Sequence, residues 1–269
     1  MANESVKPDS EAARERMRDR FFAMLLPFLL TGVIGTMVGA WFQQRGWAWQ
    51  NRVAQVEKDT GSALDALHSV SELLDKRWSA TLQMLQTVQD TTASGDSKAA
   101  AEDTFRSVNH DWEMAFANID SAIQFNVDRP FFSETKSTPE TLWKLQCESF
   151  AFGGEVAGGV SPESAHVILK VIDHCHDVLR QSIEQIGKAS NDAAARKALI
   201  RQAQVRLEHI YHINDVLRCV ILERAVSMRS SLDEEFHVGS LFQIGTRRYS
   251  VPPRERQCVE RYRAWAAKH

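Results

Sequence analysis

The hydrophobic pattern has one long uncharged stretch near the start of the chain. Phe21 to Trp41 comprises twenty-one residues without a charged side chain, and its polar positions are Thr31 and Thr36. About 20 apolar residues, at about 1.5 Å rise each, cross a hydrocarbon core of about 30 Å. The pattern therefore predicts a transmembrane helix over residues 21–42, preceded by a charged tail over residues 1–20.

A cleaved secretory signal is the alternative for this stretch. Residues 38–40 have the small side chains of a cleavage site. The apolar core of such a signal, however, runs for about 7–15 residues, which is shorter than this stretch. The aromatic residues that follow are typical of the belt at a membrane interface, and they are Trp41, Phe42, Trp47 and Trp49. We therefore favour a retained anchor.

The basic residues on either side of the stretch predict its orientation. Five Lys or Arg residues precede it, and three lie in the nineteen residues after Trp41. Loops rich in Lys and Arg stay in the cytoplasm. We expect a bacterial inner-membrane protein with a cytoplasmic N-terminus and a periplasmic C-terminal portion.

Small residues within the stretch predict a self-association face. Gly35 and Gly39 form a G-x-x-x-G pair. This spacing lets two membrane helices approach closely, so a parallel homodimer is a candidate. The alternative is that glycine is simply common in membrane helices.

The rest of the chain shows helical periodicity and little else. We expect a stalk helix over residues 43–90 that continues from the anchor, and further helices over residues 98–232. Their apolar positions recur every three or four residues, which is the period of helix packing. The expected inward positions include Val53, Val56, Thr60, Ala63, Leu67, Val70, Leu74, Trp78, Leu82, Leu85, Val88, Phe105, Val108, Trp112, Phe116, Ile119, Ile123, Leu142, Leu145, Phe150, Ile168, Leu169, Ile172, Leu179, Ile183, Ile186, Ile200, Ala203, Leu207, Ile210, Asn214, Leu217, Ile221, Arg224 and Met228.

These elements predict an all-α fold, with one transmembrane helix and an antiparallel helical bundle built of long helices. Charged residues make up 25% and hydrophobic residues 43% of the chain, as in ordinary globular domains. The four cysteines are widely spaced, so we expect them to pack as small apolar residues rather than to form disulfides or a zinc site. Asp75, Lys76 and Arg77 interrupt the seam just before Trp78, where an interhelical charge pair is the expectation.

The C-terminal segment, residues 233–269, is expected to contain a small hairpin around Gly245 and a terminal amphipathic helix. Its basic side chains form a candidate patch for an anionic partner such as a lipid headgroup, and nucleic acid is the less favoured partner. The alternative, which we favour, is a terminal helix docked on the acidic body with its arginines paired to carboxylates. The patch comprises Arg247, Arg248, Arg254, Arg256, Arg261 and Arg263.

Histidines on two helices supply the candidate metal ligands. Asp173 and His176 are three residues apart, as are His209 and His212, so each pair shares a helix face. If the two helices were neighbours, the four side chains could bind zinc or iron. Solvated polar residues beside a packing seam are the alternative, and we favour it. We therefore expect no cofactor.

Catalytic signatures are missing from the sequence. No Gly-x-Ser-x-Gly elbow, kinase signature, dinucleotide fingerprint or phosphate loop occurs. An enzyme is therefore less favoured than a binding protein.

The stretch "LLTGVIGTMVGAWFQQRGWAWQ", followed by "SELLDKRW", carries a resemblance. It resembles uncharacterised small bacterial single-pass membrane proteins, with a Gly-rich anchor, a juxtamembrane F-x-x-R-x-W segment and a helix bearing Asp-Lys-Arg. The resemblance covers residues 25–90 and implies an architecture but no reaction.

The sequence thus predicts a membrane-anchored, partner-binding or structural subunit of a membrane or envelope complex. Two alternatives stay open. One is a sensor-type bundle that binds a ligand between its helices, and the other, less favoured, is a metal-dependent enzyme using the His and Asp residues above.

Overall fold

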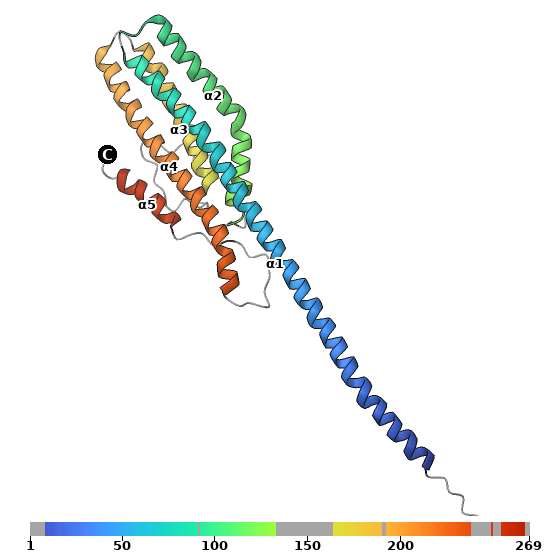
Figure 1. Cartoon of the computed structure of the whole chain (residues 1–269). Coiled ribbons are helices and arrows are strands. Elements are labelled where there is room, and N and C mark those ends of the chain that lie inside the picture. The colour runs from blue at the N-terminus through green and yellow to red at the C-terminus, as the bar shows by residue number, and fades with distance from the viewer. Residues whose placement is uncertain are drawn as a thin grey trace, which may run out of the picture. The chain divides into compact units, whose positions relative to one another are not determined.

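The structure is a computed structural model that describes residues 9–90, 92–132, 164–189, 192–237, 249 and 254–266. Every regular element in these ranges is helical, which confirms the all-α prediction (Figure 1). The elements are α1 (Asp9–Gln89), α2 (Gly95–Ile123), the π-helix η1 (Gln124–Asp128), α3 (Ala165–Lys188), α4 (Ala193–His237) and α5 (Glu255–Ala266). The predicted hairpin around Gly245 lies outside the described residues.

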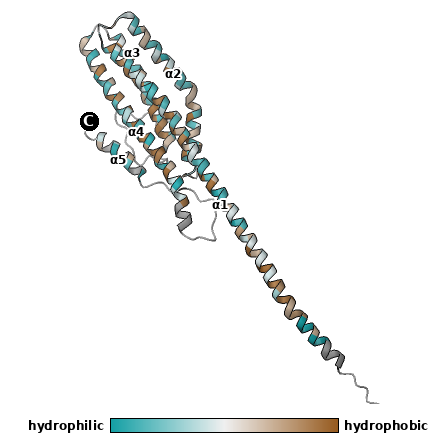
Figure 2. Cartoon of the chain, viewed as in Figure 1, coloured by the Kyte–Doolittle hydropathy of each residue, from teal (hydrophilic) through white to brown (hydrophobic). Residues whose placement is uncertain are grey.

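The chain divides into two compact units, Met1–Ala54 and Gln55–His269, and we call the second the helical unit. The first unit contains the apolar stretch of α1, visible in Figure 2. Its large side chains are exposed, and Phe28 is 80% exposed. By length and composition, α1 contains a segment that could cross a membrane.

This apolar segment contains two threonines, and both of their hydroxyls are hydrogen-bonded. Thr31 donates from Oγ1 to the carbonyl of Pro27 at 2.6 Å, and Thr36 donates to the carbonyl of Gly32 at 2.8 Å. Both hydroxyls are therefore satisfied by the helix itself. Pro27 lies within the same helix, and proline is tolerated in membrane helices.

One hydrophobic core fills the helical unit, and it is built from α1, α2, α3, α4 and α5. Most of the inward positions expected from the periodicity are buried, from Val56 on α1 to Met228 on α4. The partly buried ones are Val53, Thr60, Leu67, Trp78, Leu82, Val88, Val108, Phe116 and Ile200, and Leu142, Leu145 and Phe150 lie outside the described residues. Burying such side chains stabilises a fold by about 1.5–3 kcal/mol each. The helical period therefore identified the core faces correctly.

Contacts between helices give the directions in which they run. On α1 and α4, Asp75 pairs with Arg218, whereas Val88 accepts a hydrogen bond from Arg196. The numbering thus rises in opposite directions along these two helices. On α2 and α3, Trp112 contacts Asp173. The end of α2 leads through η1 to Asp128, which contacts the start of α3, so these helices also run oppositely.

Side-chain caps begin three of the helices. Ser94 accepts a hydrogen bond from the backbone N–H of Ser97 and starts α2. Asp192 accepts from Ala194 and Ala195 and starts α4. Such caps satisfy backbone donors that have no partner inside the helix. For α3, the capping carboxylate comes from Asp128, far away in the sequence.

The prediction for the cysteines is wrong. Cys219 on α4 and Cys258 on α5 form a disulfide with Cα atoms 5.8 Å apart, and Cys175 is disulfide-bonded as well. The wide spacing along the chain was misleading, because α5 folds back onto α4 and closes a sequence separation of 39 residues. Disulfides persist in oxidising compartments and are rare in the cytosol.

Candidate functional site

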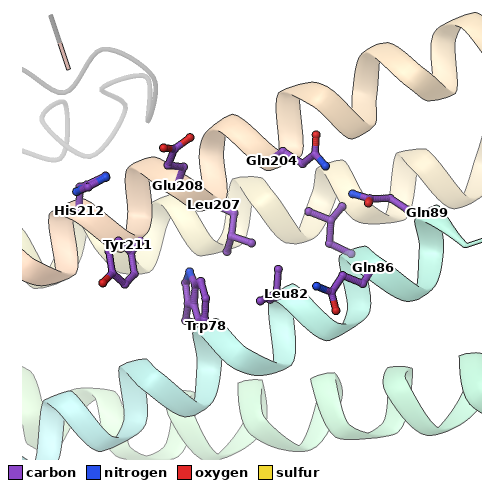
Figure 3. Close-up of a pocket in the computed structure, with 10 residues that line it drawn as sticks. Trp78, Leu82, Gln86, Gln89, Gln204, Leu207, Glu208, Tyr211 and His212 are labelled. Atoms are coloured by element: carbon purple, nitrogen blue, oxygen red, sulfur yellow. The ribbon is translucent and has the colours of Figure 1, made fainter. Parts of the chain in front are cut away.

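A groove of about 630 Å³ lies between α1 and α4 in the helical unit (Figure 3). This volume lies within the range of about 300–1,000 Å³ that is usual for small-molecule sites. The α1–α4 groove is therefore our candidate functional site. It is lined by Trp78, Leu82, Leu85, Gln86 and Gln89 of α1 and by Gln204, Leu207, Glu208, Tyr211 and His212 of α4.

Helical spacing places the apolar lining on facing sides of the two helices. Trp78, Leu82 and Leu85 follow one another at intervals of four and three residues. Side chains at these intervals share a helix face. Trp78 and Leu82 point toward α4, while Leu207 and Tyr211 point toward α1 (Figure 3). The groove therefore has an apolar floor.

Two aromatic rings lie at one end of the groove. The ring centroids of Trp78 and Tyr211 are 5.7 Å apart, and their planes are tilted by 51°. The indole Nε1 of Trp78 is buried and has no hydrogen-bond acceptor among the described residues. A buried donor without a partner is costly, by about 1–3 kcal/mol, unless a ligand or water supplies an acceptor.

Polar side chains line the rest of the groove. Three are the amides of Gln86, Gln89 and Gln204. Glu208 projects from α4 on the side away from α1, at the rim (Figure 3). None of the described lining residues is Lys or Arg, so Glu208 is the group that gives this site its charge.

The rim at His212 adjoins α5. The rings of His212 and Trp265 are 3.9 Å apart, and the rings of His209 and Trp265 are 4.8 Å apart. The Tyr262 hydroxyl lies 3.4 Å from His209 Nδ1, and burial raises the pKa of that hydroxyl to about 12. The disulfide fixes α5 to α4 and so holds Trp265 against the rim.

A buried polar cluster lies where α1, α2 and α3 meet. Arg77 donates from Nη1 to Asp173 at 2.8 Å and from Nε to Asn109 at 3.0 Å. Trp112 donates from its indole to the same Asp173 oxygen at 2.7 Å, and Arg77 lies over the Trp112 ring at 4.9 Å. Asp177 lies 3.7 Å from the guanidinium. This confirms the interhelical charge pair that the Asp-Lys-Arg sequence predicts.

Burial is the main cause of the pKa shifts in this cluster. It lowers the pKa of Arg77, although Asp173 and Asp177 oppose the shift. Burial and the neighbouring charge of Asp173 raise the pKa of Asp177. Burial, together with the positive charge of Arg77, holds the pKa of His176 well below its usual value, so this imidazole is neutral at pH 7.

A second buried cluster surrounds Asp128 of η1. Its carboxylate accepts from the backbone N–H groups of Ala165 at 2.9 Å and His166 at 3.0 Å, and it pairs with Arg224. Burial alone would raise the pKa of Asp128, but the hydrogen bond from His166 and the charge of Arg224 bring it below its usual value. Asp128 therefore joins η1, α3 and α4.

The Asp128 cluster contains the residue types of a hydrolase triad but not its geometry. Ser164 Oγ and Asp128 Oδ2 both lie 2.7 Å from Nδ1 of His166. In a working triad, the serine and the carboxylate lie at opposite nitrogens of the imidazole. All three side chains are also buried. The cluster is consistent with a structural role.

A second opening of about 460 Å³ lies between α1, α2 and α3, and it includes Asn109, Glu113 and Arg180. Its lining carries acidic and basic side chains together. This mixture favours no single class of ligand.

The structure does not join the four predicted metal ligands into one site. Asp173 bonds to Arg77 and Trp112, and His176 is buried beside them. His209 and His212 instead contact Trp265 of α5. Among the described residues, no group of three or more His, Cys, Asp or Glu side chains could hold a metal ion. Each pair shares a face as expected, but the two faces meet different neighbours.

The remaining predicted positions are described in part. Gly35 and Gly39 have open space where a Cβ would stand, so their face is uncovered. Arg254 and Arg261 are exposed, and neither pairs with a carboxylate in the described part of the chain. Arg261 instead donates to Cys219 Sγ at 2.9 Å. Arg247 and Arg248, and the side chains of Arg256 and Arg263, lie outside the described residues.

No protein family, curated protein or solved structure that was compared with this chain matches it. The resemblance to small bacterial membrane proteins therefore stays a prediction.

Sequence reasoning included Trp78 and Leu82 in a packing seam but missed the groove beside them. The glutamines that line it were overlooked, because polar residues beside a seam usually face solvent. The available signal was the presence of Trp78 and Tyr211, two large aromatic side chains on these helices; their contact is visible only in the structure.

Proposed function

We propose that the chain is a single-pass membrane protein whose helical unit lies outside the cytoplasm. In this role it acts as a partner-binding or structural subunit of a membrane or envelope complex. The observation that carries the location is the Cys219–Cys258 disulfide, since such bonds persist outside the cytosol. The excess of basic residues before the apolar stretch favours the same orientation.

The proposed architecture is an antiparallel bundle formed by α2, α3, α4 and the part of α1 after Ala54. It is supported by the opposite directions of α1 and α4 and of α2 and α3. The G-x-x-x-G spacing of Gly35 and Gly39 supports a parallel homodimer through the membrane helices. Such a dimer would place two helical units on the same side of the membrane.

A topology experiment tests the location. Alkaline phosphatase, and separately a fluorescent protein that matures only in the cytoplasm, are fused after His269 in a bacterial host. We expect phosphatase activity without fluorescence, and protein in the membrane fraction that retains an N-terminal tag. Fluorescence without phosphatase activity would overturn the orientation. Loss of the tag would instead favour a cleaved signal.

Ligand binding is the second candidate function, and the α1–α4 groove favours it. The groove combines an apolar floor, an aromatic pair and an indole donor that lacks an acceptor among the described residues. Small-molecule sites typically have this composition, with apolar walls and a few polar groups that orient the ligand. A membrane-anchored helical unit with such a groove would bind its ligand outside the cytoplasm.

A further inference from the structure

The α1–α4 groove also indicates the charge of its ligand. Glu208 is its acidic residue, and the described lining contains no Lys or Arg. A carboxylate attracts cations and repels anions, and the effect grows near low-dielectric walls. The leucines opposite the rim cannot solvate an ion. A charged group bound here would therefore sit at the rim, next to Glu208.

The aromatic residues strengthen this preference. Tyr211 follows Glu208 by three residues on α4, so the two side chains are neighbours on the helix. Tyr211 is 44% exposed and lines the groove. The faces of tyrosine and tryptophan rings carry partial negative charge and bind organic cations. The Tyr211 and Trp78 rings line one end of the groove, and Glu208 stands at the rim above them.

The floor and the indole specify the rest of the ligand. Leu82, Leu85 and Leu207 offer an apolar surface below the rim. The N–H of Trp78 has no acceptor in the described chain and exposes no surface. A ligand acceptor reaches it only when the indole turns toward the groove, and the bond would then satisfy the donor. A carbonyl or hydroxyl oxygen would satisfy it.

We propose that the α1–α4 groove binds a small organic ammonium ion that has an apolar body and one hydrogen-bond acceptor. The ammonium group lies at the rim, near Glu208 and the exposed edge of Tyr211, the body contacts the leucines, and the acceptor faces the Trp78 indole. This inference rests on the ligand-binding function proposed above and is independent of the side of the membrane.

Three probes with the same phenyl body and a carbonyl oxygen test the charge preference. They are phenylalaninamide, which is cationic, 3-phenylpropanamide, which is neutral, and 3-phenylpropanoate, which is anionic. Their affinities for the full-length protein in nanodiscs of zwitterionic lipid are measured by saturation-transfer NMR, with empty nanodiscs subtracted. We expect the cation to bind about tenfold more tightly than the other two, the scale of one ion–ring contact with a nearby carboxylate.

Variants on the same helices locate the binding. Glu208→Gln should lower the affinity for the cation about tenfold and leave that for the neutral amide unchanged. Glu223→Gln, on α4 but outside the groove lining, is the matched control and should change neither. Leu82→Trp should fill the groove and abolish binding of all three probes.

Two results would overturn the inference, and only the second would also contradict the proposed ligand-binding function. If the neutral amide binds as tightly as the cation and Glu208→Gln changes neither, the groove binds ligands but does not select cations. If no probe binds saturably, or if Leu82→Trp leaves binding intact, the ligand-binding function fails as well.

Discussion

Arg77 of α1 and Asp173 of α3 are joined by a hydrogen bond of 2.8 Å across the interior of the helical unit. The side chain of Arg77 is 3% exposed, so its charge depends on this partner. Removing one member of a buried pair leaves the other without compensation and costs about 3–5 kcal/mol. The pair therefore fixes how α1, α2 and α3 fit together, because Asp173 also accepts from Trp112 on α2.

We predict that Asp173→Asn lowers the free energy of unfolding by about 2 kcal/mol, which is below the range for a fully buried pair because the Asp173 side chain is 30% exposed. Asp177→Asn is the matched control, because Asp177 lies on the same helix and contacts the same guanidinium at 3.7 Å while its side chain is 45% exposed. That variant should lose less than about 1 kcal/mol. Urea unfolding followed by circular dichroism measures both. Equal losses in the two variants would contradict the role given to Asp173.

Because His176 is buried, we predict that the stability of the folded protein decreases on mild acidification. Its pKa is lowered by burial and by Arg77, so the unfolded chain takes up a proton at a higher pH than the folded chain does. Stability contributed by the neutral imidazole is thus present above pH about 6.5 and is lost as the pH falls toward the folded-state pKa. Thermal melts between pH 7.5 and pH 5.5 should show a decrease in Tm that is smaller in His176→Leu.

The control for this prediction is His110→Gln, since His110 is exposed on α2. That variant should keep the full pH dependence of the wild-type protein. If His176→Leu and the wild-type protein lose Tm equally on acidification, the buried imidazole is not the sensitive group.

The helical periodicity was enough to predict which faces are buried, but not which faces meet. Asn214 and Arg224 were correctly placed among the inward positions of α4, because burial follows the three- and four-residue spacing. The spacing of His209 and His212 likewise predicted a shared face. It could not show that this face meets Trp265 of α5, because that depends on how α5 folds back along α4.

The spacing also does not show which residues far apart in the sequence contact each other. Asp128 was not singled out, because nothing local marks it as the cap of α3. Cys219 and Cys258 were read as unpaired for the same reason. Arg77 was the exception, since a charge inside an otherwise apolar seam requires a buried partner.

We predict that Asp128→Asn destabilises the protein by about 3–5 kcal/mol at pH 7, because it leaves Arg224 buried without a counter-charge. Both side chains are fully buried. The pKa of Asp128 lies below its usual value, so its contribution is present above pH about 4 and is lost as the pH falls through the folded-state pKa.

Asp120→Asn provides the comparison, because Asp120 on α2 pairs with the partly exposed Lys170 at 3.5 Å. Its loss should be about 1 kcal/mol or less. Chemical denaturation at pH 7 and at pH 3 measures the two effects. The difference between wild type and Asp128→Asn should shrink at the lower pH, and a constant difference would contradict the assigned role of the carboxylate.

The disulfide gives a last prediction, about the attachment of α5. It closes a separation of 39 residues. A cross-link of this length lowers the conformational entropy of the unfolded chain and so raises the free energy of unfolding by about 3–4 kcal/mol. The double variant Cys219→Ser and Cys258→Ser should lose stability on this scale in urea unfolding without reductant, while retaining the helices of the core. Trp265 should then become more accessible to a fluorescence quencher, because its contacts with His209 and His212 require α5 on α4.

Dithiothreitol should still lower the stability of the double variant, because the bond at Cys175 is intact there. The decrease should be smaller than in the wild-type protein, and an identical decrease would show that the Cys219–Cys258 bond contributes nothing.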